Sequence, residues 1–344
     1  MIKIKLYEFE KHRNECTFRP YLWAHNVLRD IGIEFTDGDS YDYAWVAQAS
    51  IINKRVSLKE SVENGLEFLS KISGDYMLLD GQDATTLIGT YEVFKESNAL
   101  LLLKSSLLKD RSLYKQGWHL GRYYWGEGDY KLEDFDQYSD RIILSGTNWI
   151  STHYSGINVQ WYDYSKPKQY DVSAMFQYPQ GMDVYEHGQL QSSHYDKFRK
   201  PVIDVLDQLD SKYNLARLEN GVRVSTEEYY KRTSNAKILL APFGYGAMAP
   251  RDLEAAMFGS ILIKPDMSFI DTYPNPYIDG ETYIACKHDF SDLQQKIEEV
   301  LGNYNKFSYI IENARKTFSE LYTQENVARR VYKLFNNLTN TQQE

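Results

Sequence analysis

A glycine-rich turn before a charged helix start has the residue types and spacing best suited to chemistry in this sequence. Gly244, Tyr245 and Gly246 follow the apolar run 237–241, and Pro250 suits the first position of a helix. Glycines let backbone N–H groups come close to a ligand, and a helix N-terminus carries partial positive charge. The pattern therefore predicts a binding site for an anion such as a diphosphate.

Two charged residues in the first turns of that helix sharpen the prediction. Arg251 stands where the helix dipole disfavours a cation, so a bound anion would explain its presence. Glu254 lies three residues on and on the same face, where it suits hydrogen bonds from the hydroxyls of a ribose. The alternative is an exposed ion pair between Arg251 and Glu254, which stabilises a helix by only about 0.2–0.5 kcal/mol.

The residues from Ala241 to Asp271 resemble the C-terminal half of GT-B glycosyltransferases, most closely their exostosin-like and spore-coat (CgeB-like) domains. The shared motifs are Ala-Pro-Phe-Gly-Tyr-Gly-Ala, Arg-Asp-Leu-Glu-Ala and Gly-Ser-Ile-Leu-Ile-Lys-Pro-Asp-Met. The resemblance implies a nucleoside-diphosphate sugar as donor, with Arg251 on its diphosphate and Glu254 on its ribose. Lys264, in the third motif, joins this predicted donor site. Ala247 stands where the family pattern often has an acidic residue, which leaves no carboxylate for that role.

The alternation of strand-like and helix-like segments predicts an α/β protein with parallel sheets covered on both faces. The resemblance implies the GT-B fold, in which two Rossmann-like domains face each other across a central cleft. We expect an N-terminal acceptor-binding domain over 1–165, a nucleotide-sugar-binding domain over 166–320, and a C-terminal helix and tail over 321–344. The polar, aromatic segment 160–168, which contains a proline, marks the hinge.

Local signals predict several boundaries of the elements that position these residues. Segment 21–30 is predicted to form one helix. Ser57, Ser225 and Ser291 each precede an acidic or amide residue by three positions and are predicted to cap helices. Gly259 is a suitable end for the helix that begins at Pro250.

Two carboxylates are candidates for a general base. Inverting glycosyl transfer needs the leaving diphosphate neutralised and the acceptor hydroxyl deprotonated. Asp80 and Asp83 lie just beyond the predicted strand 76–79, and ligands bind open α/β sheets beyond the carboxyl ends of their strands. We expect one of the two to be the catalytic base, and the alternative is an Asx turn that caps the next helix.

Two other segments carry candidate binding residues. The loop 186–200 corresponds to a GT-B loop that often reaches the phosphates, so His194 and Arg199 are candidates for the donor site, with solvated charges at a helix start as the alternative. An aromatic, glycine-rich segment further upstream suits either an acceptor platform or a packed Ω-loop. Its candidate acceptor-binding residues are Trp118, Arg122, Tyr124 and Trp125.

No cofactor or metal is expected, because the resemblance implies that the helix dipole and basic side chains neutralise the diphosphate. The triplets 37–39 and 134–136 match the Asp-x-Asp pattern of metal-dependent GT-A enzymes. In a chain this rich in aspartate such triplets arise by chance. The first of them also precedes a strand, where it suits a turn.

Composition limits the class of protein. A chain of 344 residues is long enough for two domains, and a net charge of −9 does not suit a nonspecific nucleic-acid binder. Cys16 and Cys286 lack metal-ligand spacing and suit free thiols in a reducing compartment. No apolar run approaches the roughly 18 residues of a membrane span, and segment 2–8 is strand-like rather than a signal peptide. We therefore expect a cytoplasmic protein.

These observations predict a metal-independent GT-B glycosyltransferase that moves a sugar from a nucleoside-diphosphate donor to a hydroxyl of a glycan, a small molecule or a modified nucleic-acid base. One alternative is a phage-type DNA glycosyltransferase that acts on hydroxymethylated pyrimidines. A nucleotide-sugar 2-epimerase with the same fold is a second, and a non-catalytic protein that binds sugar nucleotides is a third.

Overall fold

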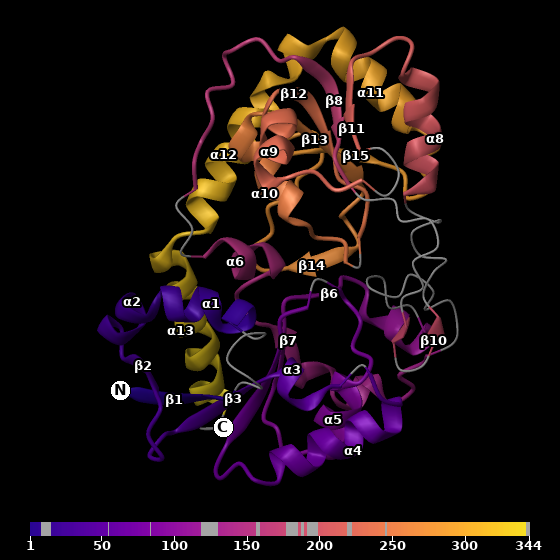
Figure 1. The fold of residues 1–344 in the computed structure, drawn as a ribbon. Coiled ribbons are helices and arrows are strands. Elements are labelled where there is room, and N and C mark those ends of the chain that lie inside the picture. The colour runs from indigo at the N-terminus through magenta and orange to yellow at the C-terminus, as the bar shows by residue number, and fades with distance from the viewer. Residues whose placement is uncertain are drawn as a thin grey trace.

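The protein folds into two parallel β-sheets, each flanked by helices (Figure 1). The computed structural model describes residues 1–7, 15–53, 55–82, 84–117, 130–155, 159–176, 185–186, 189–190, 199–218, 222–244 and 246–341. The α/β class and the two parallel sheets predicted from the sequence are confirmed.

The first sheet has six strands in the order β2-β1-β3-β4-β5-β7, all parallel. Its strands are β1 (Ile2–Tyr7), β2 (Ile33–Thr36), β3 (Tyr43–Ala47), β4 (Tyr76–Asp80), β5 (Leu102–Lys104) and β7 (Ile142–Leu144). The helices of this half are α1 (Glu15–Trp23), α2 (His25–Asp30), α3 (Gln48–Ile51), α4 (Leu58–Leu69), α5 (Thr90–Glu96) and α6 (Trp149–Tyr154), with short 3₁₀ turns at Arg111–Gln116, Phe135–Gln137 and Ser139–Arg141.

Side chains of the first sheet alternate between two cores, as strand geometry requires. In β3, Val46 enters the core formed with α4 and α5, whereas Trp45 enters the core formed with α1 and α2. The C-terminal helix α13 (Gln324–Thr341) also packs in this second core, where Phe335 stacks on Trp45 with ring centroids 5.8 Å apart. Both faces of the sheet are covered, which explains its apolar strands.

The second sheet has five parallel strands in the order β11-β8-β12-β13-β15. Its strands are β8 (Tyr170–Ala174), β11 (Leu215–Arg217), β12 (Ala236–Leu240), β13 (Ile261–Pro265) and β15 (Ile284–Cys286). The helices of this half are α8 (Lys200–Leu209), α9 (Thr226–Ser234), α10 (Pro250–Phe258), α11 (Leu293–Gly302) and α12 (Ser308–Leu321), with a 3₁₀ turn at Tyr304–Phe307. A separate pair of short antiparallel strands consists of β9 (Tyr185–Glu186) and β10 (Gln189–Leu190).

The carboxyl edges of the two sheets face each other. Strand β6 (Ser106–Leu108) directly follows β5, strand β14 (Ile270–Thr272) follows β13, and the two pair in antiparallel register. Beside them, Arg111 Nη2 lies 2.8 Å from Asp271 Oδ2. Because β6 and β14 each continue from the end of a parallel strand, this pairing joins the edges at which α/β sheets bind ligands.

In the described part of the chain, two segments that pass between the halves are bonded to each other. Asn148, which caps α6, donates from Nδ2 to Tyr322 Oη over 2.7 Å. Arg330 of α13 donates from Nε to the carbonyl of Gly146 over 2.5 Å. The two segments thus form one hydrogen-bonded unit.

Most of the local helix signals are confirmed, and two are wrong. Ser57 and Ser225 accept hydrogen bonds from the third backbone N–H that follows each of them. Ser291 makes no such cap, because α11 begins one residue later with Asp292 as its N-cap. Segment 21–30 is not one helix, since Ala24 separates α1 from α2.

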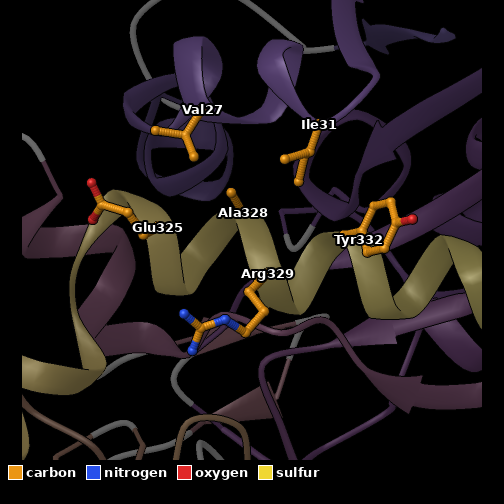
Figure 2. A pocket seen from close by; sticks show the side chains of 6 residues that line it. All are labelled: Val27, Ile31, Glu325, Ala328, Arg329 and Tyr332. Atoms are coloured by element: carbon orange, nitrogen blue, oxygen red, sulfur yellow. The ribbon is translucent and has the colours of Figure 1, made fainter.

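A groove of about 510 Å³ runs between α2 and α13 (Figure 2). It is lined by Val27, Ile31, Glu325, Ala328, Arg329 and Tyr332. None of these residues belongs to the sites predicted from the sequence. Within the described part of the chain, the helices include none long and apolar enough to cross a membrane.

Candidate functional site

The glycine turn lies where the strand order of the second sheet reverses. From β8 the chain runs to β11 on one side, and the later strands then follow on the other side, beginning with β12. The gap between β8 and β12 is therefore the topological switch point at which open α/β sheets bind ligands. Phe176 follows β8 and Gly244 follows β12, so both lie at this gap.

Helix α10 starts at the switch point, and its first residue is the one predicted from the sequence. Pro250 is its first residue, and the N-cap residue Ala249 donates its backbone N–H to Asp252 Oδ2 over 3.0 Å. Gly259 ends the helix in the left-handed region with φ 66°. In the turn itself, Gly244 N donates to Gly246 O over 3.1 Å. The N-terminus of α10 is thus directed toward the carboxyl edge of the sheet.

Two arginines lie near this turn, and the guanidinium groups of both lie over the ring of Phe176. Arg199 Cζ lies 5.8 Å from the ring centroid and Arg251 Cζ lies 6.0 Å from it. Arg199 Nη2 would also be 3.6 Å from a Cβ placed on Gly244. Two guanidinium groups beside a glycine turn at a helix N-terminus form a positively charged site that suits a diphosphate.

Arg251 does not form the ion pair with Glu254 that was the alternative to a ligand role. In the described part of the chain Arg251 makes no ion pair, and its Nε is buried without an acceptor. Glu254 turns away from solvent, with 6% exposure, and accepts a hydrogen bond from Tyr229 Oη at 2.5 Å. A buried donor without an acceptor carries a free-energy cost that a bound anion would remove.

Tyr229 is a neighbour of Glu254 that the sequence did not single out. It lies in α9, whose start is set by the Ser225 cap. Burial raises the pKa of Tyr229; the charge of Arg251 lowers it, and Glu254 raises it again. The tyrosine is therefore a protonated donor at neutral pH, and the three side chains lie within electrostatic reach of one another.

Lys264 does not line the site, contrary to its predicted contact with the donor. Its side chain is fully buried, with Nζ 2.6 Å from Asp252 Oδ2 and 2.8 Å from the carbonyl oxygen of Ala247. Tyr277 Oη donates to the same Asp252 oxygen over 2.6 Å. Desolvation lowers the pKa of Lys264, and the charge of Asp252 opposes this shift. Lys264 therefore stabilises the loop that follows the glycine turn, through its hydrogen bond to the carbonyl of Ala247.

Asp80 is likewise internal, which argues against its predicted role as general base. It has no exposed surface, and its Oδ1 lies 3.0 Å from Lys104 Nζ. Thr90 Oγ1 donates to Oδ2 over 3.1 Å, and the backbone N–H of Gln82 donates to Oδ1 over 3.1 Å. The last bond is an Asx turn, as in the alternative given above, but it does not cap the next helix, because the N-cap of α5 is Gly89. A carboxylate held in this way does not reach an acceptor hydroxyl.

Glu92 is another buried carboxylate of the N-terminal half. Unlike Asp80, it was not predicted from the sequence to be a site residue. It lies in the first turn of α5, where Oε2 accepts a hydrogen bond of 2.7 Å from the backbone N–H of Gly89 and Oε1 accepts one from Tyr130. Burial raises the pKa of Glu92 to about 7. The sequence shows an acidic residue three positions after Gly89, but it does not show the burial that shifts the pKa of Glu92.

Several predicted site residues lie outside the described part of the chain. These are Asp83, Trp118, Arg122, Tyr124, Trp125, His194 and Tyr245. Among the described residues, His, Cys, Asp and Glu form no cluster of three that could hold a metal ion. The described carboxylates of the two Asp-x-Asp triplets include three that pair with lysines, namely Asp39 with Lys5, Asp134 with Lys95 and Asp136 with Lys115.

Comparison with solved structures identifies the arrangement. A sucrose-phosphate synthase from Thermosynechococcus elongatus superposes with a TM-score of 0.53 at 11% identity, over 99% of this chain and 100% of that one. HepE from Anabaena, solved in complex with UDP and glucose, superposes with a TM-score of 0.52 at 10% identity, over 98% of this chain and 100% of that one. The chain has the GT-B fold.

The GT-B fold agrees with the resemblance seen in the sequence. No family model matches the chain, and no curated protein matches it. At 10–11% identity the solved structures establish the fold alone. In the GT-B fold of this chain, the site between β8 and β12 belongs to the second sheet and opens toward the first.

Proposed function

We propose that the protein is a glycosyltransferase that uses a nucleoside-diphosphate sugar as donor and a hydroxyl group as acceptor. The convergence of Arg199 and Arg251 on Phe176, beside the glycine turn at the start of α10, is the observation that carries the proposal. HepE, which shares the fold, was solved with UDP and glucose. The sequence motifs further support an exostosin-like or CgeB-like subclass.

The proposed reaction breaks the bond between the anomeric carbon of the sugar and the diphosphate oxygen. The leaving diphosphate takes the electron pair, and the two guanidinium groups with the α10 N-terminus stabilise its charge. The acceptor oxygen forms the new bond to the anomeric carbon and loses its proton to a base. Of the two predicted carboxylates, Asp83 remains the proposed base, because Asp80 is held in an internal ion pair.

No step of this proposal uses a metal. The charge that a divalent cation would neutralise is met by Arg199, Arg251 and the helix dipole. Glu254, one turn into α10, is the proposed partner of the ribose hydroxyls. The acceptor is proposed to be a glycan or a small molecule that binds over the carboxyl edge of the first sheet.

The first test is binding, followed by turnover. Thermal unfolding is measured with UDP, ADP, GDP and CDP and with the corresponding glucose conjugates. A ligand at a hundredfold excess over its Kd stabilises the native state by roughly 2.7 kcal/mol. Incubating the best donor with panels of sugars and of hydroxymethylated DNA then reports transfer by mass spectrometry.

The outcomes separate the functions. Transfer to any acceptor supports the enzyme, and the acceptor panel decides between glycan and DNA chemistry. If the donor binds but is neither transferred nor hydrolysed, the result supports a non-catalytic nucleotide-sugar-binding protein. Failure of all four nucleoside diphosphates to bind at millimolar concentration contradicts the proposal.

A further inference from the structure

We infer that Tyr229 is a positioning residue that holds the Glu254 carboxylate for recognition of the donor's ribose, an inference that rests on the proposed function. Tyr229 belongs to α9 and Glu254 to α10, so the contact joins two helices of the second domain. The hydrogen bond between Tyr229 Oη and Glu254 Oε2 is 2.5 Å long. A bond of this length is typical of a hydroxyl donating to a charged oxygen.

The hydrogen bond from Tyr229 matters for stability because the Glu254 carboxylate is buried. Glu254 is 6% exposed, and a carboxylate removed from water is costly unless it accepts hydrogen bonds. Tyr229 supplies one such bond and, through the rigid phenol ring, fixes its direction. A carboxylate offers about four acceptor positions, so one bond from Tyr229 does not by itself saturate it.

The position of the pair relative to Arg251 fits a nucleoside diphosphate. Arg251 and Glu254 lie three residues apart on α10, hence on one face about one turn from each other. A ribose is linked directly to the diphosphate through its 5′ oxygen. A ligand whose phosphates lie at Arg251 therefore places its ribose one turn along, at the carboxylate that Tyr229 orients.

Tyrosine is suited to this role because its protonated hydroxyl donates to the Glu254 carboxylate. Burial raises the pKa of Tyr229, while Arg251 and Glu254 act in opposite directions on it. The hydroxyl therefore keeps its proton through the neutral range. A phenylalanine in its place keeps the ring packing and removes this one hydrogen bond.

The adjacent residue provides a matched control. Tyr230 lies in the same helix, and its ring packs edge-on against Phe258 with centroids 5.4 Å apart. Within the described residues its hydroxyl makes no hydrogen bond. Tyr230→Phe thus removes a hydroxyl from the same helix without removing a hydrogen bond to Glu254.

The test measures preference for ribose over deoxyribose. Calorimetry gives the Kd of wild type, Y229F and Y230F for whichever of UDP, ADP, GDP and CDP the wild type binds most tightly, and for its 2′-deoxy form. We expect wild type and Y230F to prefer the ribonucleotide roughly tenfold or more, the range of a hydrogen bond to a charged group. Y229F should lower this ratio to about threefold or less, chiefly by weakening the ribonucleotide.

A double-mutant cycle checks that the effect passes through the carboxylate. In E254Q the preference should already be low, and adding Y229F should leave it unchanged. Equal loss of affinity for both nucleotides in Y229F, or a ratio equal to that of Y230F, overturns the inference and leaves the proposed function intact. Absence of binding by the wild type overturns the proposed function and this inference together.

Discussion

Asp80 and Lys104 form a fully buried ion pair, with 3.0 Å between Oδ1 and Nζ, at the carboxyl ends of neighbouring strands. The second domain contains a similar pair, in which Lys264 Nζ lies 2.6 Å from Asp252 Oδ2. In both domains the lysine also donates to a carbonyl of the adjoining loop, over 2.7 and 2.8 Å. Each pair thus fixes a loop that faces the opposite domain.

Asp80→Asn should destabilise the fold rather than impair chemistry alone. It leaves the Lys104 ammonium buried without its carboxylate, and breaking such a pair typically costs about 3–5 kcal/mol. Urea denaturation should therefore show a lower free energy of unfolding by about this amount. Replacing the pair together, as Asp80→Leu with Lys104→Met, should cost less. A stable Asp80→Asn protein with turnover lowered by roughly 10²–10⁴-fold would instead identify Asp80 as the base.

Arg251→Ala should weaken donor binding while leaving the fold intact. A charge-assisted hydrogen bond to phosphate contributes roughly 1.5–3 kcal/mol, so Kd for the nucleoside diphosphate should rise about tenfold or more. Arg217→Ala is the control, because Arg217 pairs with Asp207 and Asp210 instead of facing the glycine turn. Calorimetry on both variants provides the measurement. Equal affinities in the two would remove Arg251 from the diphosphate site.

Glu92→Gln should stabilise the protein more at pH 8 than at pH 5. Burial raises the pKa of Glu92 from 4.5 to about 7, so the folded state binds a proton that the unfolded state has lost. Stability contributed by this group is therefore present below pH 4.5 and is lost as the pH rises to about 7. The difference in free energy of unfolding between variant and wild type should change by up to roughly 3 kcal/mol between pH 4.5 and about 7.

The control for that measurement is Glu67→Gln. Its hydrogen bond with exposed Lys71 lowers the pKa of Glu67, so this variant should not gain stability as the pH rises. Unfolding curves at both pH values test the two variants side by side. If Glu92→Gln shows the same small change as Glu67→Gln, Glu92 is ionised in the folded protein.

Gly259→Ala should be much more damaging than Gly280→Ala. Both glycines have positive φ, 66° and 73°, which costs any other residue about 1–2 kcal/mol. A Cβ on Gly280 meets nothing within 4 Å, whereas a Cβ on Gly259 would lie 2.2 Å from Tyr164 Cβ. We therefore expect a shift in Tm of several degrees for Gly280→Ala and a larger one for Gly259→Ala. Similar shifts would show that Tyr164 moves aside without cost.

The parts of the site that depend on local signals were predictable. Pro250 and Gly259 set the two ends of α10 through their own backbone preferences, and the structure places both as expected. Ser57 and Ser225 cap helices by bonds that span three residues. Such signals need no knowledge of the rest of the fold.

The parts that depend on distant neighbours were not predictable. Asp80 looked like a site residue because it lies at a strand end, and Lys264 because it lies in a family motif, but partners from other elements bury both of them. Glu254 was expected from the motif, whereas its partner Tyr229 comes from another helix. Strands β6 and β14 are only three residues long and pair across domains, so neither has a recognisable periodicity.

The packing of α13 against the first sheet affects how this domain folds during translation. Val331 and Phe335 complete the core around Ile4 and Trp45, so residues more than 300 positions apart in the sequence meet there. During synthesis, which adds roughly 5–20 residues per second, the first domain leaves the ribosome with one apolar face covered by α1 and α2 but not yet by α13. The part of that face beneath α13 stays exposed to solvent or to chaperones until α13 has been translated. The first domain therefore completes its core only after the second domain has been synthesised.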